Sequence, residues 1–221
     1  MRLPFSGLVL LLMLAGCQSF GALDTLRAAI WGGPSPDGRA LNPAYRYLRV
    51  AIRKDVAFLA LGYVEPHPQG KFEVWFSASR EVLRLRNGRL AGITGTFTEW
   101  RQVRLPELPS WRTLAQSGQP YAWERIRDVM PGYRYNVIDR LELRRIDPPA
   151  QNALVGIAPE TLTWFEESRL RLPVAGDDQN QLPPARYAVD LTGPAGEQVV
   201  YAEQCYSAGD CMTWQRWRAG Q

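Results

Sequence analysis

The sequence of 221 residues is poor in the side chains that enzymes and metal sites most often use. It contains one histidine, His67, and three cysteines, Cys17, Cys205 and Cys211. A Ser-His-Asp or Cys-His arrangement would have to use His67, which lies between prolines at residues 65–70 and is better interpreted as an exposed loop histidine. A zinc site would need more soft ligands than the chain offers. We therefore expect no metal and no cofactor.

Motifs of the common catalytic classes are also missing. The chain has no Gly-x-Ser-x-Gly elbow, no P-loop and no Gly-x-Gly-x-x-Gly turn. Two adjacent acid pairs, Glu166-Glu167 and Asp177-Asp178, could in principle hydrolyse glycosides. Neighbours on a strand point to opposite faces, however, and the second pair lies in a loop, so we interpret both pairs as solvated acids. The chain is not expected to be an enzyme.

No apolar run reaches the length of about 20 residues that a membrane-spanning helix needs. The run at residues 8–14 is shorter; Arg2 precedes it and the small residues Ala15 and Gly16 follow. This order is typical of a secretory signal and its cleavage site. The residues Leu14-Ala15-Gly16-Cys17 match the lipobox of bacterial lipoproteins, in which the cysteine receives a diacylglycerol before cleavage. Cys17 is thus predicted to be a lipid anchor carrying palmitate-type acyl chains; an ordinary secretory signal is the alternative.

The residues after the predicted anchor indicate which membrane holds it. In Gram-negative bacteria an Asp after the cysteine retains a lipoprotein at the inner membrane, whereas this chain has Gln18 and Ser19. We therefore expect an outer-membrane protein whose body faces the periplasm. The formal charge of +4 could help to engage acidic sugars, although a solvated surface is the simpler interpretation. No basic run is dense enough to indicate nucleic acid.

Cys205 and Cys211 remain once Cys17 is assigned to the anchor. An oxidising compartment makes a disulfide the default for such a close pair. The five residues between them include a turn-forming Ser-Ala-Gly-Asp stretch, so the two ends can approach one another. We predict a disulfide between Cys205 and Cys211.

The pattern along the chain divides it into three parts. Residues 1–16 are the predicted signal peptide, and residues 17–43 hold the anchor, a short helix at 20–31 and a Gly/Pro-rich linker. Residues 44–221 are predicted to form a β-rich periplasmic domain. The predicted strands are residues 45–53, 56–64, 71–76, 81–86, 89–93, 121–127, 133–146, 186–191 and 198–204, with a last aromatic segment at 214–217.

Three segments in this domain carry specific expectations. The nearly continuous apolar run at 56–64 predicts a strand that is covered on both faces. Residues 105–120, with three prolines, predict a crossover loop, and residues 161–172 are ambiguous between strand and short helix. Many short strands separated by Gly, Pro and Asn indicate an all-β fold, an antiparallel β-sandwich or a barrel-like meander.

The clearest local feature is a β-hairpin around Asn87-Gly88, a pair that readily adopts the positive φ angles of a type I′ turn. Strand alternation places Arg84 and Arg86 on the face opposite to the neighbouring leucines, and Arg89 follows the turn. We expect these three arginines to form an exposed basic face, a candidate contact for an acidic polysaccharide or a partner protein. A solvated surface is the alternative.

The chain is also rich in aromatic residues, with eight Trp and nine Tyr. Their rings could stack on sugar faces or pack against a partner, although aromatic residues in β-sandwiches are more often core. The tryptophans considered for such a surface are Trp100, Trp111, Trp123, Trp214 and Trp217.

Taken together, these segments resemble the YjbF/GfcB-type outer-membrane lipoproteins. The resemblance rests on the lipobox, Leu23-Asp-Thr-Leu-Arg27, Trp75-Phe-Ser-Ala-Ser79, Leu85-Arg-Asn-Gly-Arg-Leu90, Thr94-Gly95, Thr163-Trp-Phe-Glu-Glu167 and the Trp-Gln-Arg-Trp end. The chain departs from the family at residues 96–100, where an Asp-containing segment would be common, and in its Cys205–Cys211 pair.

The resemblance implies a non-enzymatic accessory lipoprotein of exopolysaccharide or group 4 capsule production. Its partners would be the membrane, through the acyl chains, and other envelope proteins of polysaccharide export. Two alternatives stay open. A periplasmic glycan-modifying enzyme would show a deep cleft with two convergent carboxylates, and an envelope-assembly or lipid-binding module would show an apolar cavity.

Overall fold

Short segments that alternate between apolar and polar residues form strands throughout the described part of the chain. The computed structural model describes residues 41–67, 70–170, 181–193 and 196–219. The predicted signal peptide, the anchor Cys17 and the predicted helix at 20–31 lie outside these residues. Within them, no helix is long and apolar enough to cross a membrane.

The strands follow one another with short connections. They are β1 (Tyr47–Ile52), β2 (Asp55–Glu65), β3 (Phe72–Phe76), β4 (Val82–Arg86), β5 (Arg89–Thr94), β6 (Glu99–Arg104), β7 (Tyr121–Met130), β8 (Arg134–Ile146), β9 (Thr163–Arg169), β10 (Ala185–Asp190), β11 (Gln198–Cys205) and β12 (Cys211–Trp217). A helix, α2 (Trp111–Ser117), lies between β6 and β7, and a 3-10 turn, η2 (Pro159–Thr161), precedes β9.

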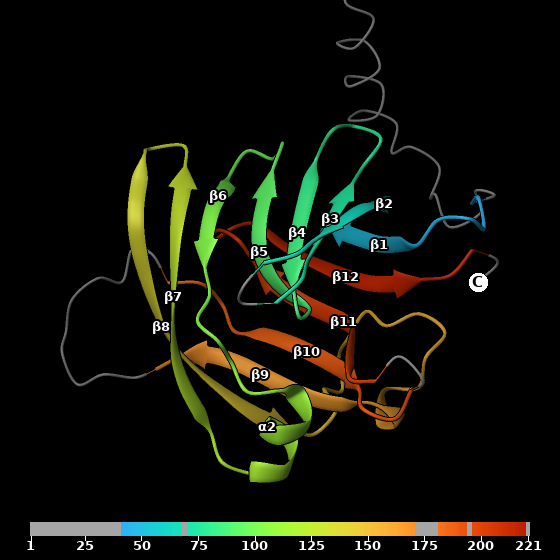
Figure 1. The fold of residues 1–221 in the computed structure, drawn as a ribbon, viewed down its shortest axis with the longest axis vertical. Coiled ribbons are helices and arrows are strands. Elements are labelled where there is room, and N and C mark those ends of the chain that lie inside the picture. The colour runs from blue at the N-terminus through green and yellow to red at the C-terminus, as the bar shows by residue number, and fades with distance from the viewer. Residues whose placement is uncertain (1–40, 68–69, 171–180, 194–195, 220–221) are drawn as a thin grey trace, which may run out of the picture. The chain divides into compact units, whose positions relative to one another are not determined.

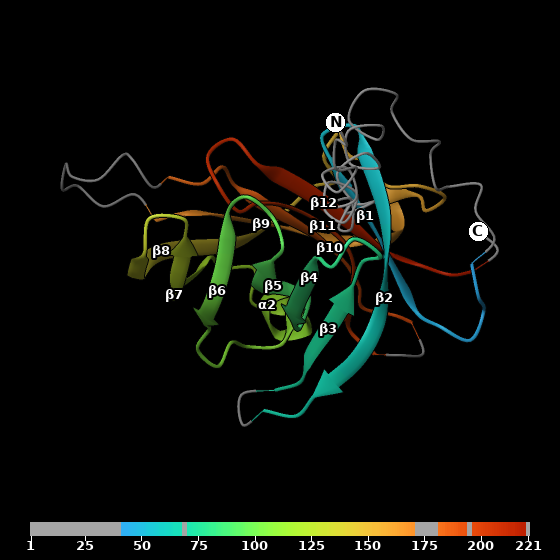
Figure 2. The same cartoon turned by 90° about the horizontal axis from the view of Figure 1, so that it is seen from above.

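The strands form a closed antiparallel barrel in which each pairs with the next and β12 pairs with β1. Figure 1 shows the barrel from the side, and Figure 2 shows the strands from above, passing from β2 to β8 along one side and returning from β9 to β1 along the other. The predicted all-β class is confirmed, and the structure specifies a closed barrel rather than a sandwich. Closure leaves no unpaired edge among the described strands.

The core fills the barrel with aliphatic and aromatic side chains, and α2 contributes to it. Ser110 caps the helix by accepting a hydrogen bond from the backbone N–H of Thr113, and Gly118, with φ of 63°, ends it. Trp111 and Leu114 on this helix are buried in the core. The predicted loop at 105–120 therefore contains a helix, because its three prolines lie outside the helical residues and leave the hydrogen bonds of the helix intact.

Two further strands differ from the sequence analysis. β6 is not among the predicted strands, and three of its six residues are charged. β2 is a strand, but only Leu59 in it is buried, whereas Tyr63 and Val64 are exposed. Its apolar run therefore covers one face of the barrel wall and leaves the other open to solvent. In the described part of the ambiguous segment, η2 ends at Thr161 and β9 follows; residues 171 and 172 lie outside the described residues.

The connection between β8 and β9 packs against the outside of the wall. Trp164, Ala188 and Tyr201 form a second apolar cluster, separate from the core, together with Leu154 and Leu162. The side-chain amide of Gln215 accepts from the backbone N–H of Val155 at 3.0 Å and donates to its carbonyl at 2.8 Å. These contacts fasten the connection to the barrel.

Candidate functional site

The barrel interior holds a buried group of charged side chains beside its apolar core. On β7, the alternate residues Trp123, Arg125, Arg127 and Val129 are all buried. Strand alternation therefore turns two arginines inward with a tryptophan and a valine. Burying a charge is costly unless it is paired and hydrogen-bonded, so the partners of these arginines define the site.

Two carboxylates supply those partners. The Arg125 guanidinium donates from Nε to Asp139 Oδ2 at 2.9 Å and from Nη1 to Glu167 Oε1 at 3.2 Å. Arg127 binds Asp139 with two hydrogen bonds, Nε to Oδ2 at 2.7 Å and Nη2 to Oδ1 at 3.0 Å. Arg125 and Asp139 are directly opposite one another on β7 and β8, and Glu167 comes from β9. The four side chains form one continuous ion-pair network.

An aromatic residue supports the network from β6. The guanidinium carbons of Arg125 and Arg127 each lie 4.8 Å from the ring centre of Trp100, within cation–π range. The Trp100 indole Nε1 donates to the carbonyl of Tyr206 at 2.8 Å, so this tryptophan is fixed at its polar end. Trp100 is thus a structural support for two buried arginines.

The network extends to β10 and β11. The Tyr187 hydroxyl lies 3.4 Å from both Glu167 Oε2 and Gln204 Oε1. Burial raises the pKa of the Tyr187 hydroxyl, so it stays a neutral donor. Arg89 is also buried, with its guanidinium carbon 3.8 Å from the Trp111 ring centre, and its Nε and Nη2 have no hydrogen-bond partner.

The two carboxylates differ in their electrostatics. Burial raises the pKa of the Glu167 carboxyl, and the charges of Arg125 and Arg89 offset this only in part. Burial also opposes ionisation of Asp139, but Arg125 and Arg127 outweigh it and the pKa of Asp139 is lowered. The same protein interior therefore shifts the pKa values of the two acids in opposite directions.

Arg125, Asp139 and Glu167 of this network line a pocket of about 410 Å³ that reaches the surface beside Ile138 and Arg140. It is here called the interior pocket, after these buried charged groups. Its residues come from β7 to β11 and from the segment that precedes β10. The lining comprises Arg125, Asn136, Val137, Ile138, Asp139, Arg140, Leu141, Glu167, Arg169, Gln181, Leu182, Pro183, Ala185, Gln204 and Cys205. A volume in this range suits a small ligand, and the polar lining suits a ligand that is rich in hydrogen-bonding groups.

Both carboxylates of the interior pocket are already engaged by neighbouring side chains. Asp139 is held in two hydrogen bonds by Arg127 and one by Arg125, and Glu167 is held by Arg125 and Tyr187. Carboxylates that are tied in this way have few lone pairs left for a substrate proton. No group of three or more His, Cys, Asp or Glu side chains in the described residues could hold a metal ion.

The predicted basic face of the β4–β5 hairpin is wrong for two of its three arginines. Arg86 and Arg89 are each only 3% exposed. Arg86 donates to the carbonyl of Leu105 at 2.8 Å and to that of Pro106. The segment leading into α2 covers this end of the hairpin, which strand alternation could not reveal. Burial lowers the pKa of both guanidiniums.

Arg84 is the member of this group that stays partly exposed. Its Nη2 donates to Glu65 Oε2 at 2.8 Å, in an ion pair at the protein surface. A contact with an acidic polysaccharide or a partner remains a prediction for Arg84 alone.

The other predicted positions fall into three groups. All five tryptophans considered for a sugar-binding surface are buried, so the core alternative holds for them. Glu166 and Glu167 do point to opposite faces, but Glu167 is buried in the network rather than solvated, while Glu166 accepts from Arg144 at 2.7 Å. Asp177-Asp178 lies outside the described residues. His67 is exposed in its turn and its ring lies edge-on to Phe72 at 5.0 Å.

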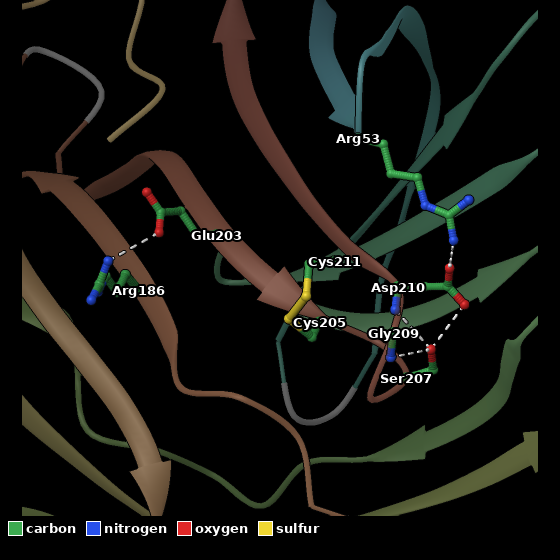
Figure 3. Close-up of a disulfide and its surroundings, with 8 residues drawn as sticks. All are labelled: Arg53, Arg186, Glu203, Cys205, Ser207, Gly209, Asp210 and Cys211. Atoms are coloured by element: carbon green, nitrogen blue, oxygen red, sulfur yellow. Dashed lines mark hydrogen bonds and ion pairs between the residues drawn. A yellow bond between two sulfur atoms is a disulfide. The ribbon is translucent and has the colours of Figure 1, made fainter. Parts of the chain in front are cut away.

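The structure joins Cys205 and Cys211 in a disulfide where β11 meets β12 (Figure 3). The two residues are directly opposite one another in the strand register, so the bond closes the tip of this hairpin. Asp210 in the turn accepts from Arg53 at 3.0 Å and from the Ser207 hydroxyl at 2.9 Å. The disulfide therefore fastens a turn that hydrogen bonds already hold.

Sequence reasoning missed the ion-pair network, although one signal for it was present. The alternation in residues 123–129 places both arginines of β7 on the face that carries a tryptophan and a valine. The opposite face carries Ile126 and Met130 together with charged residues, so the pattern alone does not tell which face is inside.

Comparison with known proteins assigns a class to this barrel. Residues 24–170 match the family model described as "Group 4 capsule polysaccharide lipoprotein gfcB, YjbF". The match spans more than half of the chain, so the chain belongs to this family of lipoproteins. None of the curated proteins compared with the chain matches it.

A solved structure has a related fold. The crystal structure of the hypothetical lipoprotein YmcC from Escherichia coli (K12) is similar, with a TM-score of 0.56 and 17% sequence identity. The similarity covers 93% of this chain and 98% of that one. It supports the fold across almost the whole length of both proteins.

Proposed function

We propose that the chain is an outer-membrane lipoprotein, anchored by acyl chains on Cys17 with its barrel domain in the periplasm. In this position it acts as a non-enzymatic accessory factor in the production or secretion of a capsule or exopolysaccharide. The observation that carries the proposal is membership of a family described as group 4 capsule polysaccharide lipoproteins. The partners would be other envelope proteins of polysaccharide export.

The interior pocket supports binding over catalysis, because both of its carboxylates are already engaged by arginines. A family role in polysaccharide production and a polar pocket in a closed barrel together favour an adaptor or carrier function. The absence of the common catalytic motifs from the sequence agrees with this reading.

The experiment compares a strain that lacks the gene with the same strain carrying the wild type, Cys17→Ala or Gln18→Asp. Deletion should lower the polysaccharide at the cell surface or in the medium, and the wild type should restore it. Cys17→Ala should abolish palmitate labelling and membrane fractionation. Gln18→Asp should keep the labelling but move the protein to the inner membrane, and Gln18→Ala serves as its control.

Two outcomes would contradict the proposal. Normal polysaccharide in the deletion strain would remove the accessory role. A Cys17→Ala protein that is still labelled by palmitate and found in the outer membrane would remove the anchor assignment.

A glycan-modifying enzyme is the second candidate, and one observation favours it. Asp139 and Glu167 line the same pocket with pKa values shifted in opposite directions, a pattern found in acid–base pairs of glycosidases. Complementation with Glu167→Gln decides between the candidates. If the variant accumulates to wild-type levels, normal polysaccharide size and yield favour the accessory role, whereas loss of both favours catalysis.

A further inference from the structure

Two aromatic side chains at one end of the barrel are exposed to an unusual degree. Phe97 is 86% exposed and Tyr133 is 73% exposed. Phe97 lies in the β5–β6 connection and Tyr133 in the β7–β8 turn, and Figure 1 shows both connections at the end of the barrel opposite to α2. Single exposed apolar side chains are ordinary at a protein surface, whereas an exposed apolar patch can mark a binding site.

The two rings line one open groove. It has a volume of about 380 Å³ and is formed by Phe97, Glu99, Arg101, Met130, Pro131 and Tyr133. The residues come from two paired strands, β6 and β7, and from the β5–β6 and β7–β8 connections. The pairing of β6 with β7 therefore holds the two aromatic positions in a defined relation.

A charged pair lies in the same groove. Glu99 Oε1 accepts from the backbone N–H of Gly95 at 2.8 Å, and Glu99 Oε2 accepts from Arg101 Nε at 2.7 Å. The backbone hydrogen bond from Gly95 lowers the pKa of Glu99, so this carboxylate is ionised at neutral pH. The Arg101 side chain is largely exposed. The groove thus presents an oriented carboxylate and a guanidinium together with two ring surfaces.

The backbone at Tyr133, like that at Arg53 and Arg80 in other turns, adopts a conformation that a bulky residue does not favour. Its φ of 52° lies in the left-handed region, where a bulky residue is strained and Asn or Gly is favoured. An exposed tyrosine at such a position makes the turn less stable than an asparagine would. Strain of this kind is found most often where a side chain is needed for function.

We propose that this groove binds a sugar unit of the polysaccharide, an inference that rests on the proposed function and names its ligand class. Phe97 and Tyr133 present ring surfaces to the apolar C–H faces of a sugar. Glu99 and Arg101 provide an acceptor and donors for its hydroxyl groups, and Arg101 can pair with a carboxylate if the sugar is acidic. The groove is therefore a polysaccharide contact on the outer rim of the barrel, separate from the interior pocket.

Other occupants fit less well. A lipid surface would have to bury the Glu99–Arg101 pair in hydrocarbon, which is costly for charged groups. A stable protein interface takes roughly 20–30 residues from each partner, whereas six residues line this groove. A sugar polymer needs only a small contact for each unit, because repeated weak contacts along the polymer raise the overall binding affinity.

The experiment measures binding of the acylated protein, purified in detergent, to the extracellular polysaccharide purified from the producing strain. Affinity electrophoresis through gels containing the polymer, supported by calorimetry, compares the wild type with Phe97→Ala, Tyr133→Asn and the double variant. Tyr45→Ala is the matched control, because Tyr45 is 56% exposed but does not line the groove. Tyr133→Asn is compatible with positive φ, so it should not unfold the turn.

Each single variant should weaken binding about tenfold, equivalent to about 1.4 kcal/mol, and the double variant more, while Tyr45→Ala binds as the wild type does. No binding by the wild type, or equal binding by the double variant, would overturn the proposal.

The result is distinct from that of the gene deletion. If deletion lowers polysaccharide but the groove variants bind and complement normally, the accessory function stands and the groove assignment fails. If deletion has no effect, the proposed function fails whatever the groove binds.

Discussion

Gly88, in the turn between β4 and β5, gives the sharpest test of the fold. Asn87 and Gly88 have φ values of 50° and 76°, as a type I′ turn requires. A Cβ atom at Gly88 would also lie 2.3 Å from both Cβ and Cγ2 of Val199, a buried residue of β11. Gly88→Ala therefore meets two penalties, a strained backbone and a steric clash with the opposite wall of the barrel.

The two free-energy costs add in Gly88→Ala, and a control variant separates them. A non-glycine residue in the left-handed region costs about 1–2 kcal/mol. Displacing a packed side chain costs about 1–3 kcal/mol. Gly88→Ala should thus lower the free energy of unfolding by roughly 2–5 kcal/mol. Gly118→Ala is the control, because Gly118 also has positive φ but no atom within 4 Å of the added Cβ, so only the backbone penalty applies.

Urea unfolding, followed by the fluorescence of the buried tryptophans, measures both variants. The loss at Gly88 should exceed that at Gly118 by at least about 1 kcal/mol, the lower bound for the clash. Equal losses would show that β11 does not press against the hairpin turn, and the placement of Gly88 against Val199 would be wrong.

Three further predictions concern stability. Arg86→Gln should lower the free energy of unfolding by about 1–3 kcal/mol, because it removes the guanidinium donors from the buried carbonyl of Leu105 and from the carbonyl of Pro106. Arg84→Gln should cost less than about 1 kcal/mol, since it breaks a surface ion pair, and similar losses for the two variants in urea titration would contradict the assigned burial. The lowered pKa of Asp139 stabilises the fold above the ordinary value of 3.8, and this contribution is lost as the pH falls through the lowered pKa. Asp139→Asn should therefore be less stable at pH 7 and show a smaller fall in stability below pH 3.8, and an unchanged acid profile would refute the linkage. Replacing Cys205 and Cys211 by Ser should lower the free energy of unfolding by about 2–3 kcal/mol, by the loop-entropy relation. If both thiols of the wild type react freely with maleimide in denatured, unreduced protein, the disulfide is absent.

The local parts of the fold follow from the sequence. Asn87-Gly88 determines a tight turn because few residue pairs accept positive φ at both positions, and the hairpin prediction is confirmed. Strand period and turn residues also predicted most of the other strands. The helix α2 was missed because its seven residues lie between prolines that suggested a loop, although Ser110 and Gly118 were readable as its caps.

The candidate sites depend on contacts that no local pattern contains. Arg86 and Arg89 alternate with leucines just as surface residues would, yet the segment leading into α2 covers them. Phe97, by contrast, is an ordinary aromatic residue in the sequence and becomes notable only because the fold leaves it 86% exposed beside Tyr133.

The sequence by itself determined the lipobox prediction, the β class and the turns, because each depends on residues that are close together in the chain. Only the tertiary structure decided that the strands close into a barrel, since the pairing of β1 with β12 joins residues at opposite ends of the domain. It also decided which face of β7 is inside. An arginine can be buried if Asp139 and Glu167 reach it from neighbouring strands, and that compensation exists only once those strands have paired.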